Sequence, residues 1–99
     1  MEILKNKYNI LCNTPSDINE HLPTLYKYAT ECESIIELGI RWCTSSWALV
    51  NGLINNNKSN KKLLMNDVTE CDIKELLNST NDLPINIFFL SDVHHHHNG

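Results

Sequence analysis

The residues with the clearest chemical pattern lie in the stretch 35–47, where an apolar segment leads into polar residues. Glu37 stands inside the apolar segment, Gly39 follows it, and Ser45 belongs to a run of hydroxyl residues. A glycine at the end of a buried strand lets another molecule approach the backbone closely. The first turn of a helix directs free N–H groups toward an anionic group. The stretch therefore predicts a binding site at a strand-to-helix turn, and Glu37 needs polar partners if its strand is buried.

Two further acids follow apolar segments in the same way. Asp67 ends the segment 62–67, and Asp92 comes shortly after the segment 85–90. In an open parallel sheet, ligands bind outside the carboxyl ends of the strands. Ionised carboxylates only accept hydrogen bonds, which suits vicinal hydroxyls, an ammonium group or an exocyclic amine. For each acid taken alone, the alternative is a helix cap or a solvated loop residue.

The turn is poor in glycine. Dinucleotide-binding turns contain three glycines, which allow the tight turn, the close approach of the pyrophosphate and the packing of the helix on the strand. Here Gly39 is alone, and Cys43 occupies the position of a second glycine. This composition disfavours a pyrophosphate clamp, and with it a nicotinamide- or flavin-binding unit, and suits a smaller anion such as an amino-acid carboxylate. Arg41 in the same turn is a candidate partner for Glu37 or for an acidic substrate, with a solvated surface arginine as the alternative.

The elements that must position these residues alternate along the chain. Near-continuous apolar segments are typical of strands buried on both faces of a parallel sheet. Capping residues and apolar stripes at helical spacing predict helices between them. The expected strands are residues 34–39, 62–67 and 85–90. One helix is expected to begin at the hydroxyl run 44–46 and to end in the Asn/Lys-rich loop 55–61, and a second to run from a capping-box-like start at Thr69 and Asp72 to the turn at 81–84. This order predicts an α/β fold, a βαβαβ unit whose parallel strands lie in the order third–second–first.

A leader precedes this unit. Apolar residues recur at helical spacing over residues 15–33, and Pro23 either kinks that helix or starts it as its first residue. We expect a leading helix over residues 23–32. Residues 1–16 match no element and stay unplaced.

The segment Glu37-Leu38-Gly39-Ile40-Arg41-x-Cys43-Thr44-Ser45 resembles a known motif. It is similar to the E-x-G-x-x-x-G motif that opens class I S-adenosylmethionine-dependent methyltransferases, and to their variants reading E-x-G-x-R-x-G-x-S-T. The resemblance extends over residues 17–93 in the order and spacing of elements. The segment resembles methyltransferase-like proteins of large DNA viruses more specifically than it resembles the family as a whole.

This resemblance implies a set of roles. Glu37 and Gly39 would lie beside the methionyl part of S-adenosylmethionine, and the turn 40–45 would wrap it. Asp67 would receive the ribose hydroxyls, and Asp92 would meet the adenine amine. The cofactor-binding set implied is Glu37, Gly39, Arg41, Cys43, Ser45, Asp67 and Asp92. Cys43 departs from the family pattern, because it places a side chain where the family has glycine.

The resemblance also implies an incomplete domain. A whole domain of the family continues through further strands that carry the substrate side of the site, whereas this chain stops shortly after the third strand. We therefore expect a partial Rossmann-like methyltransferase fold, truncated after that strand, that binds S-adenosylmethionine or S-adenosylhomocysteine and is inactive alone. No catalytic residue can be assigned. The alternatives are a non-enzymatic, truncated α/β interaction module and a nicotinamide- or flavin-binding Rossmann unit.

Composition excludes several other classes. A net charge of −4 with dispersed basic residues argues against nucleic-acid binding. No apolar run approaches the roughly 20 residues of a membrane span. The four cysteines are widely spaced, which favours buried free thiols in the cytoplasm over a zinc site or disulfides. The tail 94–99 contains four consecutive histidines, which we interpret as tag-like or accidental rather than as a metal site.

Truncation has a consequence for the strand 34–39. In the resembled fold this strand is central, whereas here it would lack one neighbour. An apolar strand edge without lysine or proline pairs readily with other chains, so we expect the chain to self-associate through this edge, to bind a partner there, or to be only marginally folded. We also expect the apolar face of Trp47, Val50 and Leu53 to be partly exposed to water.

Overall fold

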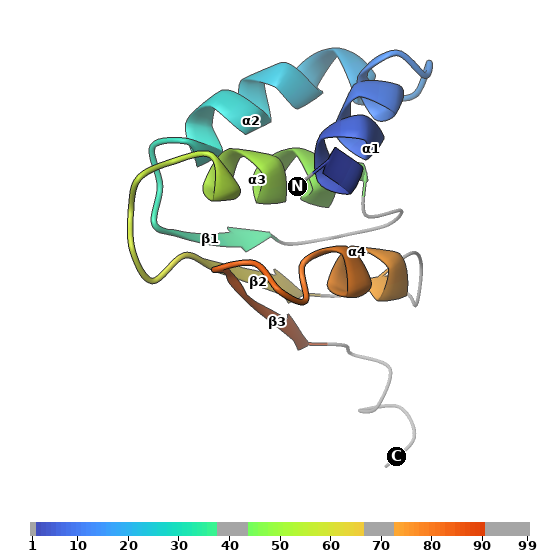
Figure 1. The fold of residues 1–99 in the computed structure, drawn as a ribbon. Helices are drawn as coiled ribbons and strands as arrows, with labels where there is room; N and C mark the ends of the chain where they lie inside the picture. Colours follow the sequence, from blue (N-terminus) through green and yellow to red (C-terminus); the bar gives the residue numbers. More distant parts are fainter. Residues whose placement is uncertain (1, 38–43, 67–72, 91–99) are drawn as a thin grey trace, which may run out of the picture.

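The structure, a computed structural model, describes residues 2–37, 44–66 and 73–90. It is an α/β arrangement in which helices and parallel strands alternate after two leading helices (Figure 1). The elements are α1 (Glu2–Cys12), the 3₁₀ helix η1 (Asn19–His21), α2 (Leu22–Ala29), β1 (Ser34–Glu37), α3 (Thr44–Ile54), β2 (Lys62–Asn66), α4 (Ile73–Ser79) and β3 (Asn86–Leu90).

The three strands form one parallel sheet in the order β1-β2-β3. Ile35 is in register with Leu63, and Leu63 with Ile87. This confirms the predicted α/β class, the parallel pairing and the strand order. The arrangement is compatible with part of a Rossmann-like fold.

The observed element bounds differ slightly from the predicted ones. The described part of the first strand ends at Glu37, because residues 38 and 39 lie outside the described ranges. The third strand begins at Asn86 because Ile85 belongs to the preceding turn, where its N–H donates to the Leu83 carbonyl. The helix after the first strand is described over Thr44–Ile54, so it ends directly before the loop of asparagines and lysines in which its end was expected.

One face of the sheet carries the hydrophobic core. Leu63 and Met65 alternate on that face of β2 and are fully buried. They belong to one apolar cluster with residues from all four α-helices, including Leu4, Ala29 and Leu76. A right-handed crossover from each strand to the next, in a constant direction, places both connecting helices on the same face. In Figure 1, α3 accordingly lies between the sheet and α2.

The prediction that the strands are buried on both faces is wrong for the second face. Ile36 is 65% exposed and Phe88 is 51% exposed, while Leu64 between them is half-buried. The apolar runs in the sequence resemble those of doubly covered strands, but all four α-helices contribute to the core on the opposite face. Conversely, the expectation that Trp47, Val50 and Leu53 meet water is wrong, because α1 and α2 cover α3 and each of the three is at most 1% exposed.

The packing of α2 on α3 depends on Gly52. A Cβ atom at this position would lie 2.4 Å from the Ala29 Cβ and 2.4 Å from the Tyr26 carbonyl oxygen. Both distances are far below van der Waals contact, so only glycine permits this approach of the two helices. Gly52 therefore sets the distance between the two layers of helices above the sheet.

The leading helix begins earlier and ends earlier than predicted. Pro23 is the second residue of α2, which begins at Leu22 directly after η1. The proline therefore stands in the first turn, where its missing N–H is not needed. The helix ends at Ala29, and the Cys32 N–H donates to the Ala29 carbonyl in the following turn.

The first residues, unplaced from sequence, form the helix α1. Its Leu4 is 1% exposed and belongs to the core. The Asn51 side-chain amide of α3 donates to the Leu4 carbonyl oxygen over 2.9 Å. The Tyr8 ring stacks on the Tyr26 ring of α2, with 5.1 Å between centroids. These contacts dock α1 against both α2 and α3.

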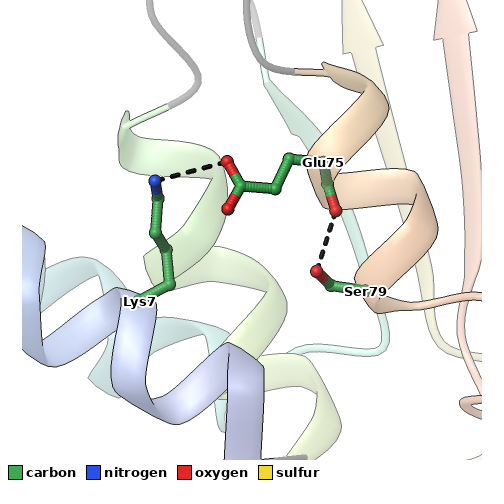
Figure 2. Close-up of polar contacts among 3 residues, drawn as sticks. All are labelled: Lys7, Glu75 and Ser79. Atoms are coloured by element: carbon green, nitrogen blue, oxygen red, sulfur yellow. Dashed lines mark hydrogen bonds and ion pairs between the residues drawn. The ribbon is translucent and has the colours of Figure 1, made fainter.

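A lysine of α1 also reaches toward α4. The Lys7 ammonium lies 3.4 Å from the Glu75 carboxylate of α4, as Figure 2 shows, and 5.4 Å from the centre of the Trp47 ring. The Ser79 hydroxyl donates to the Glu75 carbonyl one turn along the same helix. Lys7 therefore covers the buried tryptophan of α3 and links it to α4.

Candidate functional site

Glu37 is a predicted site residue whose surroundings the structure describes in detail. It stands at the end of β1, it is 8% exposed, and its two carboxylate oxygens accept different bonds. The Ser46 hydroxyl donates to one oxygen over 2.7 Å, and the Ser45 hydroxyl donates to the other. The prediction that this buried carboxylate needs polar partners is confirmed.

Burial raises the pKa of the Glu37 carboxyl above its usual 4.5, because the ionised form has lost water. The hydrogen bonds from Ser45 and Ser46 act in the opposite direction, since they stabilise the ionised form. The pKa of Glu37 is raised overall because the effect of desolvation is larger than the opposite effect of the two hydrogen bonds. Protonation of Glu37 is therefore easier in the folded chain than in an exposed peptide.

The two serines belong to the first turn of α3, which begins at Thr44. The free N–H groups of a helix N-terminus give it a partial positive charge, so a carboxylate there is favourably placed. The contact joins the end of β1 to the start of α3 and thereby holds the two ends of the segment 38–43 near each other. Glu37 therefore stabilises the junction between β1 and α3.

Sequence reasoning included Ser45 in the candidate set but omitted Ser46. Ser46 is fully buried, whereas Ser45 is half-buried. A run of hydroxyl residues at the start of a helix predicts capping residues. Which of them contacts Glu37 depends on which side chain faces the preceding strand, and the sequence does not give this. The buried acid eight and nine residues earlier was the available signal.

Of the seven predicted binding residues, the structure brings together Glu37 and Ser45. The others lie outside the described residues: Gly39, Arg41, Cys43, Asp67 and Asp92. The His-rich tail 94–99 and the capping residues Thr69 and Asp72 lie outside them too.

The predicted binding residues Asp67 and Asp92 follow the carboxyl ends of β2 and β3 in the sequence. Glu37 is in register with Met65, and Met65 with Phe89, so the described parts of the three strands reach nearly the same level at the carboxyl edge of the sheet. Asp67 directly follows β2, and Asp92 comes shortly after β3. The segments that follow β1, β2 and β3 in the sequence each contain a predicted binding residue, and these segments lie outside the described residues.

Lys61 is a buried charge that sequence reasoning missed. It precedes β2, it is 7% exposed, and its ammonium donates to the Ile54 and Asn56 carbonyls over 3.0 and 2.9 Å. Ile54 is the last residue of α3 and Asn56 lies two residues beyond it, so the ammonium stands at the carboxyl end of the helix, where the helix dipole favours a cation. Its sequence context, a run of lysines and asparagines, suggested only a solvated loop.

Two adjoining hollows lie between the helices. They have volumes of about 310 and 230 Å³ and share Lys5, Asn51 and Asn55 in their linings. The Asn55 amide donates to the Tyr26 hydroxyl over 3.1 Å, so the amides in these hollows also dock helices. Neither hollow is lined by Glu37 or Ser45.

Among residues 2–37, 44–66 and 73–90, no group of three or more His, Cys, Asp or Glu side chains is arranged to hold a metal ion. The helices of these ranges include none with the length and apolar character needed to cross a membrane. Comparisons of the chain with protein-family models, with curated proteins and with solved structures find no match.

Proposed function

We propose that this chain is the S-adenosylmethionine-binding half of a methyltransferase-like domain. The observation that carries the proposal is the parallel order β1-β2-β3, in which all three strands end at one edge of the sheet. Ligands of open α/β sheets bind at this edge. The glycine turn follows the first strand there, Asp67 the second and Asp92 the third.

In this proposal the chain's residues bind and orient the cofactor. The Asp67 carboxylate accepts hydrogen bonds from the ribose hydroxyls, and Asp92 accepts one from the adenine amine. Glu37, fixed by Ser45 and Ser46, holds the start of the turn that wraps the methionyl part. The bound cofactor would supply an electrophilic methyl group.

The proposal extends to inactivity of this chain by itself. Methyl transfer needs an acceptor and commonly a base, and neither can be assigned to its residues. Apart from the terminal run, His21 is the only histidine; it is exposed at the end of η1. We also assign the chain to the cytoplasm, which the free thiols of Cys12 and Cys32 support.

Calorimetric titration with S-adenosylhomocysteine tests the proposal, with NAD titrated in parallel. We expect binding of the first and none of the second. Binding of NAD alone would favour a nicotinamide-binding unit, and the absence of any S-adenosylhomocysteine binding would overturn the proposal.

Two variants test the residue assignments. Asp67→Ala removes acceptors of hydrogen bonds worth roughly 1.5–3 kcal/mol each, so affinity should fall about 10- to 100-fold. Asp82→Ala is the matched control, because Asp82 is an exposed acid in the turn before β3, at the other end of the strand from Asp92. Equal affinities for the wild type and Asp67→Ala would contradict the ribose assignment.

Cys43→Gly tests the departure from the family motif. A glycine restores the space that the cysteine side chain takes, so S-adenosylhomocysteine should bind more tightly. Weaker binding by this variant would show that Cys43 contributes to the site.

A second candidate function is a non-enzymatic interaction module. The exposure of Ile36 and Phe88 on the uncovered face of the sheet favours it.

A further inference from the structure

The two hollows between the helices contain a buried amide whose hydrogens are already used. Asn51 of α3 lines both hollows and is 4% exposed. Its side-chain NH₂ donates to the Leu4 carbonyl over 2.9 Å and to the Trp47 carbonyl over 2.8 Å. An amide NH₂ has two hydrogens, so both are taken. The Oδ1 oxygen is the atom of this side chain that can still bind a ligand.

This oxygen is open to the hollows. Within residues 2–37, 44–66 and 73–90, no donor contacts Asn51 Oδ1, and no buried side-chain oxygen lacks a hydrogen-bond partner. The oxygen is therefore accessible, and the space beside Asn51 is that of the hollows. Polar atoms of buried side chains are nearly always hydrogen-bonded, so this acceptor calls for a donor from a molecule in the hollows.

Asn55, one helical turn further on, is arranged in the same way. Its side-chain NH₂ donates to the Tyr26 hydroxyl over 3.1 Å and to the Asn51 backbone carbonyl over 3.0 Å. Both of its hydrogens are taken, and its Oδ1 remains as an acceptor. Asn55 lines both hollows as well. Residues four apart on a helix are neighbours, so the two amide oxygens border the same space.

The charged residues of the hollows have opposite signs. Lys5 of α1 lines both hollows, and Glu2 lines the larger one. Both are exposed, and neither forms an ion pair with another described residue. An ion with a single charge would be attracted by one of these residues and repelled by the other, whereas a zwitterion is attracted by both. Leu4 and Ile54 add an apolar wall to the larger hollow.

We propose that the hollows bind a free α-amino acid with an aliphatic side chain. Its ammonium donates to the Oδ1 oxygens of Asn51 and Asn55, and its carboxylate accepts from the Lys5 ammonium. These three residues line both hollows, so the two charged groups of the ligand lie where the hollows join. The aliphatic side chain packs against Leu4 and Ile54. The larger hollow has a volume of about 310 Å³, at the lower end of the range for ligand pockets, which suits a molecule this small.

This site is distinct from the edge of the sheet proposed for S-adenosylmethionine. Asn51 lies seven residues after Thr44, about 10 Å along α3 from its first residue. Glu37 and Ser45 contact each other at that first turn and line neither hollow. Residues of α1 and of α3 line both hollows, so a bound amino acid links the two helices. Binding should therefore stabilise the docking of α1.

Calorimetric titration with L-valine tests the proposal. We expect binding in the millimolar range, with a rise in the midpoint of thermal unfolding and slower hydrogen exchange of the α1 amides. Isobutylamine is L-valine without its carboxylate, and isovalerate is L-valine without its ammonium. At equal ionic strength each should bind about tenfold more weakly than L-valine. No binding of L-valine, or binding of isovalerate with equal affinity, would overturn the proposal.

Variants of the charged residues locate the site. Lys5→Met removes the ammonium and keeps the apolar stem, so the affinity for L-valine should fall about tenfold. Lys27→Met is the matched control, because Lys27 is exposed on α2 and lines neither hollow. It should leave the affinity unchanged, and circular dichroism checks that each variant folds.

Glu2→Gln separates a zwitterion site from a simple anion site. It removes the charge that attracts an ammonium and repels an anion, so L-valine should bind more weakly and isovalerate more tightly. Tighter binding of both ligands by this variant would overturn the proposal. Equal affinities of the wild type and Lys5→Met for L-valine would overturn it as well.

Discussion

The Ser46 hydroxyl donates a hydrogen bond to the Glu37 carboxylate over 2.7 Å, joining the first turn of α3 to the end of β1. Both residues are buried, and Ser46 has no exposed surface. In such surroundings a carboxylate that loses a donor cannot recover the bond from water. The contact therefore contributes to the stability of the strand-to-helix junction.

Ser46→Ala should lower the free energy of unfolding by about 1.5–3 kcal/mol, the range for hydrogen bonds to charged groups. Urea denaturation at neutral pH measures this change. Ser79→Ala is the control, because that hydroxyl donates to a helix carbonyl and not to a buried charge; its effect should stay within about 0.5 kcal/mol. Equal effects of the two changes would contradict the bracing role of Ser46.

Glu37 should make stability depend on pH. Its pKa is raised by burial, so between the usual 4.5 and the raised value the folded chain holds more protons than the unfolded chain. Stability from this group is therefore complete below pH 4.5 and declines as the pH rises through the folded pKa. Glu37→Gln should remove that decline from curves of unfolding free energy against pH. Identical curves for the variant and the wild type would contradict the raised pKa.

Gly52→Ala should destabilise the chain, although alanine is the better helix former by about 1 kcal/mol. The added Cβ would lie 2.4 Å from the Tyr26 carbonyl oxygen, so α2 and α3 must separate. Overpacking of this kind costs typically about 1–3 kcal/mol. Thermal unfolding measures the change, and an unchanged or raised midpoint would show that the two helices are not in close contact.

Lys61→Met should remove the two charge-assisted hydrogen bonds at the end of α3. The methionine keeps the apolar stem, so the loss isolates the ammonium group, and we expect a destabilisation of about 1.5–3 kcal/mol. Lys58→Met in the same loop is the control, because Lys58 is exposed. Urea denaturation should give a lower midpoint for Lys61→Met than for Lys58→Met. Equal midpoints would contradict the capping role of the Lys61 ammonium.

The pattern of residues was sufficient to predict the alternation of elements. Apolar segments bounded by polar residues identified the three strands, and capping residues before an apolar stripe identified α3. The strand order agrees with the tendency of strands that are consecutive in the sequence to pair with each other, which does not depend on particular side chains. The need for polar partners at Glu37 was predictable because a carboxylate inside a buried apolar segment must be hydrogen-bonded.

Other features depended on contacts between distant residues. α1 is a different case, because its sequence does place apolar residues at helical spacing, Leu4, Tyr8 and Leu11, and sequence reasoning overlooked them. Ser46 and Lys61 are single polar residues whose partners are decided by how α3 lies against β1 and β2. Gly52 is an ordinary helix position in the sequence and becomes essential only where α2 crosses it.

The covering of the sheet shows most clearly what the sequence by itself determined and what it left to tertiary structure. Adjacent apolar residues such as Ile35 and Ile36 determine that both faces of β1 are apolar. Alternation along the strand then sends the two to opposite faces, but it does not say which face the helices cover. Two crossovers of the same hand and direction put α3 and α4 on one side, so Ile35 packs against the core and Ile36 remains exposed.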